Sequence, residues 1–174
     1  PNFRICIFLT SNEEGEPSDG KINKIIKDLQ AAGEHIDYCL VGEASSSSKL
    51  ADTIRLGRRG SLSGTLTIKG KQGHVAYPDK VNNPIHLSGK IIDSLKEKNW
   101  DNGNEFFEPT SFQISNISSG TGATNVVPGL LEMKFNLRFS SESTEDSLKE
   151  KILSILDDHG VEYEIEWVLN AIPF

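Results

Sequence analysis

Apolar residues in the first 50 positions form two short runs on either side of a segment with helical periodicity. Residues 3–10 and 36–41 are nearly continuous apolar runs of strand length, while isoleucine and leucine recur through 22–29 on one face of a helix that should end near Gly33. A strand, a helix and a second strand with short connections form a βαβ unit, and non-alternating apolar strands are typical of a parallel sheet. The loops after both strands are then expected at one sheet edge, where open α/β sheets bind ligands.

The pattern changes character after the serine-rich connection at 45–49. Apolar and polar residues now alternate in several segments, which is typical of strands with one buried face. The predicted elements are strand 63–69, helix 84–96, strand 110–117, strand 130–139, helix 145–158 and strand 161–169. Their order, βαββαβ, is the ferredoxin-like arrangement. The predicted fold class is therefore α/β, with a partial βαβ domain at 1–50 and a complete ferredoxin-like domain at 55–170.

Capping signals support the two helices of the second domain. Asn83 is suited to cap a helix whose first residue is Pro84, because a missing N–H costs nothing at that position. Ser143 followed by Asp146 resembles a capping box, and Gly160 predicts the end of the same helix.

Composition excludes several classes of function. The formal net charge is −7, and acidic and basic residues are interspersed, which argues against nucleic acid as a partner and favours a small molecule or a protein. The chain has neither an apolar stretch long enough to span a bilayer nor a signal-peptide pattern, so we expect no membrane association and a cytoplasmic location. Cys6 and Cys39 lie within the apolar runs and are predicted to be reduced and buried. Because the chain begins with Pro1 close to an apolar run, we interpret it as an interior fragment.

Three carboxylates are expected at the predicted ligand-binding edge. Glu13 and Glu14 follow the first apolar run, and Glu43 follows the second. Carboxylates that converge raise one another's pKa unless a cation is present, and a divalent metal would be bound by some of them while another accepts a proton from a metal-bound water. The alternative is that this acidic segment is a solvated surface loop.

Polar side chains in three loops of the second domain are further candidates. His74 stands between a glycine and a turn, where an imidazole is presented rather than packed, although a lone loop histidine is often inert. Arg58 and its neighbour Arg59 offer planar donors for a carboxylate, and Thr124 and Asn125 lie beside a glycine-rich loop. The alternatives are solvated arginines and a simple connection between strands. The other histidines are interpreted as structural or solvent-facing: His35, His86 and His159.

Six segments taken in order carry a family resemblance that covers essentially the whole chain. They are FLTSNEEG, DYCLVGE, GRRGSLSGTLTIKGKQGHVAYP, NNPIH, PTSFQISNISSGTGATNVVPG and KFNLRFS. The series resembles the middle of the di-zinc amidohydrolase family, which holds acetylornithine deacetylases, aminoacylases and carboxypeptidases, and within it the succinyl-diaminopimelate desuccinylases. The resemblance implies a zinc-hydrolase catalytic domain at 1–50, a lid or dimerisation domain at 55–170, a homodimer formed through the lid, and hydrolysis of N-succinyl-LL-2,6-diaminopimelate to succinate and LL-2,6-diaminopimelate in lysine biosynthesis.

The resemblance also implies roles for the acidic residues. Glu13 matches the general base, and Glu14 and Glu43 match ligands of the two zinc ions, which cobalt can replace. The family's other zinc ligands have no counterpart in this chain, so the fragment is expected to be inactive alone. Related deacylases such as acetylornithine deacetylase, and a dimerisation module without metal, remain as alternatives.

For the lid, the resemblance implies contacts with substrate on both sides of a dimer. His74 matches the histidine that reaches the partner's active site and stabilises the oxyanion. Asn125, with Thr124 beside it, matches lid residues that touch substrate across the dimer, while Arg58 and Arg138 match contacts to a substrate carboxylate.

Overall fold

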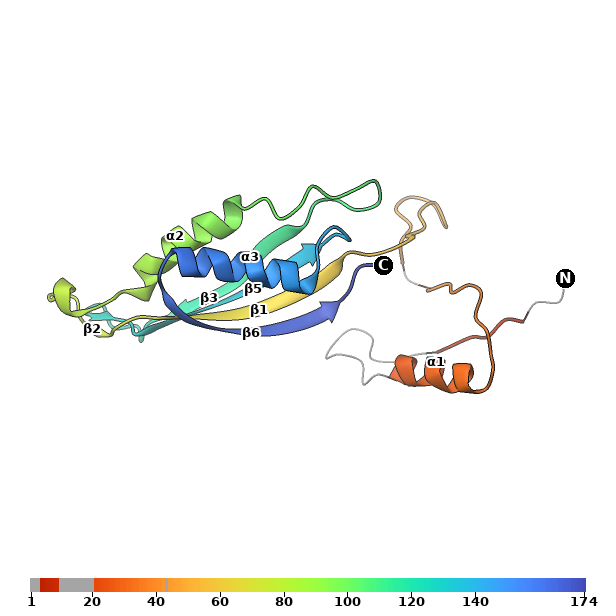
Figure 1. The fold of residues 1–174 in the computed structure, drawn as a ribbon, viewed down its shortest axis with the longest axis horizontal. Helices are drawn as coiled ribbons and strands as arrows, with labels where there is room; N and C mark the ends of the chain where they lie inside the picture. The colour runs from red at the N-terminus through yellow and green to blue at the C-terminus, as the bar shows by residue number, and fades with distance from the viewer. Residues whose placement is uncertain (1–3, 10–20, 43) are drawn as a thin grey trace. The chain divides into compact units, whose positions relative to one another are not determined.

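The computed structural model describes residues 4–9, 21–42 and 44–174. The chain divides into two units, residues 1–54 and residues 55–174 (Figure 1). Among the described residues, none of the helices is both long enough and apolar enough to cross a membrane.

The first unit contains the predicted helix. Helix α1 spans Lys21–Ala31, and its last turn closes with Gly33, whose N–H donates to the carbonyl of Gln30 at 3.0 Å. The φ of Gly33 is +75°, a left-handed conformation that commonly ends helices. The helical periodicity of 22–29 is therefore confirmed.

The two apolar runs that flank α1 do not form the predicted strands. Residues 4–9 and 36–41 have no strand assignment, and Leu9 among them is 93% exposed. A strand forms only where a neighbour accepts and donates its ladder hydrogen bonds, and neither run pairs with another strand in the described part of the chain. The predicted burial of Cys6 and Cys39 is wrong for the same reason, since both are free and exposed.

The second unit has the predicted βαββαβ order. Its elements are β1 (Gly60–Lys69), β2 (Gly73–His74), a 3-10 turn (Pro78–Lys80), α2 (Pro84–Glu97), β3 (Ser111–Ser119), β4 (Val126–Val127), β5 (Leu130–Phe139), α3 (Glu145–Asp158) and β6 (Glu162–Ala171). The main sheet has the order β3-β5-β1-β6, and every neighbouring pair is antiparallel. This is the ferredoxin-like topology, so the predicted arrangement is confirmed. The short ladder between β2 and β4 was not predicted.

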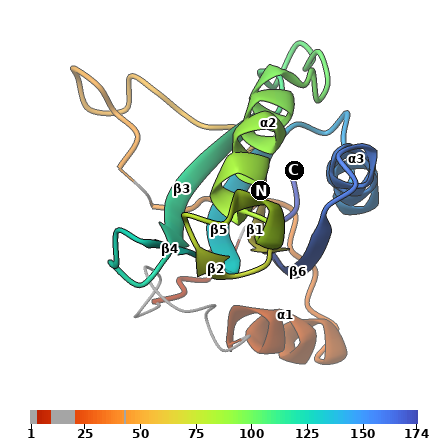
Figure 2. The ribbon, with the colours of Figure 1, turned by 90° about the vertical axis from the view of Figure 1, so that its left-hand side faces the viewer.

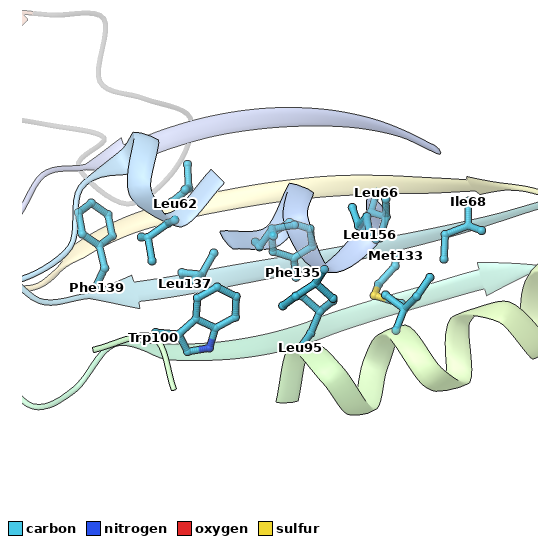
Figure 3. Close-up of a cluster of buried hydrophobic side chains, with 14 of the residues drawn as sticks. Leu62, Leu66, Ile68, Leu95, Trp100, Met133, Phe135, Leu137, Phe139 and Leu156 are labelled. Atoms are coloured by element: carbon cyan, nitrogen blue, oxygen red, sulfur yellow. The ribbon is translucent and has the colours of Figure 1, made fainter. Parts of the chain in front are cut away.

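Both helices cover the same face of the sheet (Figures 1 and 2). Strand β5 alternates buried and exposed residues along most of its length, and its buried side chains meet those of β1, α2 and α3. Figure 3 shows Leu62, Leu66, Phe135 and Leu137 of the sheet together with Leu95 of α2 in this core. Within residues 55–174, neither helix covers the opposite face of the sheet, where β1 and β5 carry mainly polar residues.

The caps confirm two predictions and correct one. The side chain of Asn83 accepts a hydrogen bond from the N–H of Ile85 at 3.0 Å, as expected for the cap of α2. Gly160 follows α3 with a φ of +61°, as expected for a helix stop.

The predicted capping box of Ser143 and Asp146 is wrong. The N-cap of α3 is Thr144, which accepts from the N–H of Ser147 at 3.2 Å while the Ser147 hydroxyl accepts from the N–H of Thr144 at 2.9 Å. The Ser143 hydroxyl instead donates to the Asp101 carboxylate at 2.6 Å. The box is thus shifted by one residue.

Candidate functional site

The predicted acidic site cannot be placed in space, because Glu13, Glu14 and Glu43 lie outside the described residues. Within 4–9, 21–42 and 44–174, no group of three or more histidine, cysteine, aspartate or glutamate side chains is arranged to hold a metal ion. The geometry of the candidate site therefore comes from the second unit.

The beginning of β1 borders a hollow of about 790 Å³ on the helix-free side of the sheet. We call it the arginine pocket, because four arginines line it together with polar side chains of the sheet. Its lining comprises Arg55, Gly57, Arg58, Arg59, Ser61, Ser63, Phe106, Phe107, Glu108, Asn136, Arg138, Asn170 and Ala171. The structure thus brings together Arg58 and Arg138, which are 80 positions apart in the sequence. Guanidinium groups in this number favour a ligand with a carboxylate.

A hydrogen-bonded row of side chains forms the floor of the arginine pocket. The Asn136 amide donates to the hydroxyl oxygens of Ser61 and Ser63, each at 3.0 Å. Ser63 in turn donates to the side-chain oxygen of Asn170 at 2.9 Å. The Ser61 oxygen is occupied as an acceptor, and its hydrogen has no acceptor among the described residues. Ser61 is therefore set to donate to an acceptor in the pocket.

Backbone pairing fixes the position of Arg58. Its N–H donates to the carbonyl of Phe174 at 3.0 Å, and the Phe174 N–H donates back to the Arg58 carbonyl at 3.2 Å. The Arg58 guanidinium also lies over the Phe174 ring, 5.6 Å from its centre. The preceding residue must be small, because a Cβ on Gly57 would lie 2.2 Å from the Phe174 carbonyl oxygen.

The loop between α2 and β3 closes one side of the pocket and is held by Asp101. The Asp101 carboxylate accepts from the N–H of Gly103 at 3.0 Å, from the N–H and hydroxyl of Thr110, and from the Ser143 hydroxyl. Burial raises the pKa of Asp101, but hydrogen bonds from Ser143 and Thr110 together outweigh burial and hold this pKa well below its usual range. The carboxylate therefore joins this loop to the turn after β5.

His74 lies at the other end of the sheet, on the short strand β2. Its Nδ1 accepts from the N–H of Ala76 at 3.1 Å, and its ring centre is 5.9 Å from that of Tyr77. In the neutral imidazole the hydrogen is then on Nε2. Because the side chain is exposed, this N–H can donate to a ligand.

The β2–β4 ladder brings a second predicted loop next to His74. His74 pairs with Val126, and the N–H of Val75 donates to the carbonyl of Asn125 at 3.1 Å. Thr124 precedes Asn125 in the same exposed turn. Three predicted site residues, His74, Thr124 and Asn125, are therefore grouped; we call this group the histidine end.

The arginine pocket borders the end of the main sheet where β1 begins, and the histidine end lies beyond its opposite end, where Figure 1 shows β2. Strand β1 begins beside the pocket and runs ten residues before the chain turns into β2. At roughly 3.3 Å per residue, this strand separates the two groups by about 30 Å. A small molecule bound at one group does not reach the other group of the same chain.

Sequence reasoning identified three of the four arginines, Arg58, Arg59 and Arg138, but neither Arg55 nor the polar floor. Ser61, Ser63, Asn136 and Asn170 have ordinary local sequence contexts, and only the pairing of β5 and β6 with β1 brings them together. The one available signal was the polar face of 130–139, which predicted that Asn136 and Arg138 share a side of the strand.

Comparison with known proteins gives one family and several close relatives. The family described as "Peptidase dimerisation domain" matches residues 56–164. A succinyl-diaminopimelate desuccinylase from Thiobacillus denitrificans is 53% identical over 170 residues, which cover 98% of this chain and 43% of that protein. A second, from Shewanella piezotolerans, is 54% identical over 170 residues, with 98% and 44% covered. The chain thus spans less than half the length of the curated relatives it matches.

Solved structures share the fold at low sequence identity. An M20 family metallo-carboxypeptidase from Sulfolobus solfataricus matches with a TM-score of 0.59 at 17% identity, over 69% of this chain and 45% of that chain. A tripeptidase from Staphylococcus aureus matches with a TM-score of 0.52 at 19% identity, over 68% of this chain and 31% of that chain. At these identities the likeness concerns the fold.

Proposed function

The chain belongs to the peptidase dimerisation domain family, and from this premise we propose that it is part of a dimeric zinc amidohydrolase that hydrolyses N-succinyl-LL-2,6-diaminopimelate. The reaction yields succinate and LL-2,6-diaminopimelate. The proposal is supported by desuccinylases that are 53% and 54% identical to nearly the whole chain.

The observation that carries the proposal is the separation of the arginine pocket from the histidine end. Both present groups suited to one reaction, since arginines bind a carboxylate and a histidine N–H stabilises an oxyanion. Because about 30 Å of sheet lies between them, one active site uses both only if a second copy supplies one of them. We propose that each site combines the arginine pocket of one subunit with the histidine end of its partner.

Within such a site, the residues of this chain bind and orient the substrate. Arg58 and Arg138 hold the terminal carboxylate of the succinyl group, and the Ser61 hydroxyl donates to the same oxygens. The partner's His74 donates from Nε2 to the oxygen of the amide carbonyl as negative charge develops there. Thr124 and Asn125 of the partner lie beside this histidine and contact the substrate.

The metal part of the proposal rests on the sequence resemblance. Glu14 and Glu43 are proposed as ligands of two zinc ions, and Glu13 as the base that accepts a proton from water. Bound zinc polarises a carbonyl and lowers the pKa of a bound water. The chain alone lacks the remaining ligands of the family and is proposed to be inactive by itself.

The edge strand β3 is the proposed dimer edge, together with the adjacent helix α2. Its sequence SFQISNISS has no charge and no proline, and most of its residues are exposed. The opposite edge, β6, carries glutamates at 162, 164 and 166, and charged side chains protect an edge from pairing. Pairing across a two-fold axis is therefore favoured at β3.

Subunit exchange tests the composite site. In the full-length enzyme, assayed at a substrate concentration far below the wild-type KM, His74→Ala and Arg138→Ala variants are each expected to form dimers of low activity. In a mixed dimer, the subunit with intact Arg138 receives intact His74 from its partner, so one of the two sites is complete. Random exchange makes about half of the dimers mixed and restores about a quarter of the wild-type rate.

Each alternative predicts a different result in the same assay. If both groups acted within one chain, verified mixed dimers would show no recovery. A full-length enzyme that prefers an N-acetyl amide over the N-succinyl amide contradicts the proposed substrate, because an acetyl group has no carboxylate for the arginine pocket. An enzyme that turns over neither amide supports a non-catalytic dimerisation module instead.

A further inference from the structure

Phe106 is an exposed aromatic side chain at the rim of a strongly polar pocket. It is 77% exposed, yet it lines the arginine pocket. Its neighbour Phe107 is half-buried and packs against the chain at Gly57, where its ring would lie 3.3 Å from an added Cβ. One phenylalanine thus holds the loop in place, while the ring of the other is exposed and lines the pocket, where aromatic side chains commonly contact a ligand.

The backbone around Phe106 is held by the side chain of Asn104. The Asn104 amide oxygen accepts from the N–H groups of Phe106 and Phe107, each at 3.0 Å. The Asn104 amide nitrogen donates to Ser141 at 2.9 Å and to Glu142 at 2.8 Å, so the loop is tied to the turn after β5. Phe106 lies within a loop whose backbone is held by these hydrogen bonds, so the fold fixes the position of its backbone at the rim of the pocket.

Besides Phe106, two apolar side chains belong to the lining of the arginine pocket, Phe107 and Ala171. Its other side chains are chiefly guanidinium, hydroxyl, amide and carboxylate groups: Arg55, Arg58, Arg59, Ser61, Ser63, Glu108, Asn136, Arg138 and Asn170. These groups suit the carboxylate of an acyl chain but not the methylene groups between that carboxylate and the amide. Because Phe107 packs against the chain at Gly57, Phe106 is the large apolar side chain of the lining that is left exposed to contact a ligand.

We propose that Phe106 determines acyl-chain specificity, its ring forming the apolar wall along which the methylene groups lie while the arginines bind the terminal carboxylate. This inference rests on the proposed function and deepens it. The ligand class is an N-acyl amide whose acyl group is a short dicarboxylate. An acetyl group, which has neither the methylene segment nor the carboxylate, does not reach this wall.

The experiment compares acyl groups in the full-length, metal-loaded enzyme. Phe106→Ala is expected to lower kcat/KM for the N-succinyl substrate about tenfold, as for other losses of apolar contact in a binding pocket. Most of the loss is expected in KM, because the contact exists before the transition state. For the N-acetyl analogue the change is expected to stay within about twofold, so the preference for succinyl falls.

Two further variants separate contact from loop structure. Phe106→Leu keeps an apolar wall and is expected to retain most of the preference. Glu105→Ala changes an exposed neighbour that does not line the pocket and is expected to leave both substrates unaffected. Binding of free succinate, measured by calorimetry, is expected to weaken in Phe106→Ala and not in Glu105→Ala.

The outcomes also separate this inference from the function on which it rests. If the unmodified enzyme has no activity on the succinyl amide, the proposed function fails. If it is active but Phe106→Ala leaves the succinyl-to-acetyl ratio and succinate binding unchanged, only the inference fails. An equal loss on both substrates with a lowered unfolding temperature would assign Phe106 to packing and overturn it as well.

Discussion

The two ends of the ferredoxin-like unit are built in different ways. The arginine pocket has a floor of hydrogen-bonded side chains on long strands and a wall that Asp101 and Asn104 fasten to the sheet. The histidine end consists of a two-residue ladder and an exposed turn, and His74 is held by one hydrogen bond from the backbone. One end is a preformed recess and the other a projection.

Under the proposed composite site, this difference separates the roles of two copies of the chain. The recess would bind a part of the substrate that does not change during the reaction, so its arginines would act mainly on ground-state binding. The projecting histidine would contribute only when it meets the reacting atoms of another subunit.

The largest effect is expected at the histidine end. In the full-length enzyme, His74→Ala is expected to lower kcat about 100- to 1000-fold, as the loss of one oxyanion donor does elsewhere, with a small change in KM. Steady-state kinetics on the succinyl substrate measures this. The matched control is His86→Ala, another exposed histidine close to the same end, which is expected to stay within about twofold. Equal losses for the two variants would contradict a specific role for His74.

The arginine pocket is expected to show the opposite kinetic signature. Arg138→Ala removes a charged donor and is expected to raise KM for the succinyl substrate about 10- to 100-fold, with kcat changed less. Arg138→Lys restores the charge but not the planar fork, and is expected to recover part of the loss. A fall in kcat with an unchanged KM would show that the two ends do not differ as we describe.

A third prediction concerns the fastening of the pocket wall. Asp101→Asn removes a carboxylate that accepts from Thr110 and Ser143 and is expected to lower the free energy of unfolding by about 1 to 2 kcal/mol at pH 7, in the lower range because the group is only partly buried. Urea denaturation of this chain measures the difference. A matched control is Asp93→Asn, for which no comparable set of hydrogen bonds is found among the described residues.

The same variant tests the sign of the pH dependence. Hydrogen bonds hold the pKa of Asp101 below its usual range in the folded chain, while the unfolded chain has an ordinary pKa of about 3.9. The contribution is therefore fully present above pH of about 4 and is lost as the pH falls toward the folded value. The difference between wild type and Asp101→Asn is expected to begin to shrink as the pH falls below about 4 and to keep shrinking toward the lower folded pKa. A constant difference would contradict this cause.

The smallest effect is expected near the histidine end, at the cap of α2. Asn83→Ala removes the acceptor for the Ile85 N–H and is expected to cost about 1 kcal/mol of unfolding free energy. Thr144→Ala at the cap of α3 should cost a similar amount. Thermal unfolding of the two variants compares the caps, and a clearly larger loss at Asn83 would indicate a role beyond capping.

Much of the second unit could be predicted from the sequence because its signals are local. Alternation along 130–139 and 161–169, the cap at Asn83 and the stop at Gly160 each reflect the residue's own backbone or its nearest neighbours. The capping box was placed one residue too early because the competing partner of Ser143 is Asp101, which is 42 positions away. A long-range hydrogen bond of this kind has no local signal.

The first unit shows the limit of the same reasoning. Its apolar runs at 4–9 and 36–41 have strand-like composition, yet they form no ladder in the described part of the chain. Propensity favours an extended backbone, but a strand also needs a neighbour. The polar floor of the arginine pocket was missed for a related reason, because only strand pairing places Asn136 between Ser61 and Ser63.

The pair of backbone hydrogen bonds between Arg58 and Phe174 also affects how a domain of this kind can be inserted into a longer protein. It brings together the positions at which the chain enters and leaves the ferredoxin-like fold. Residues 58 to 174, more than a hundred positions, are then inserted into a host domain through two adjacent ends. The entropic cost of closing this long loop is offset within the inserted domain itself and not by the host. A unit of this kind can be gained, replaced or excised at a single surface turn without re-routing the host chain.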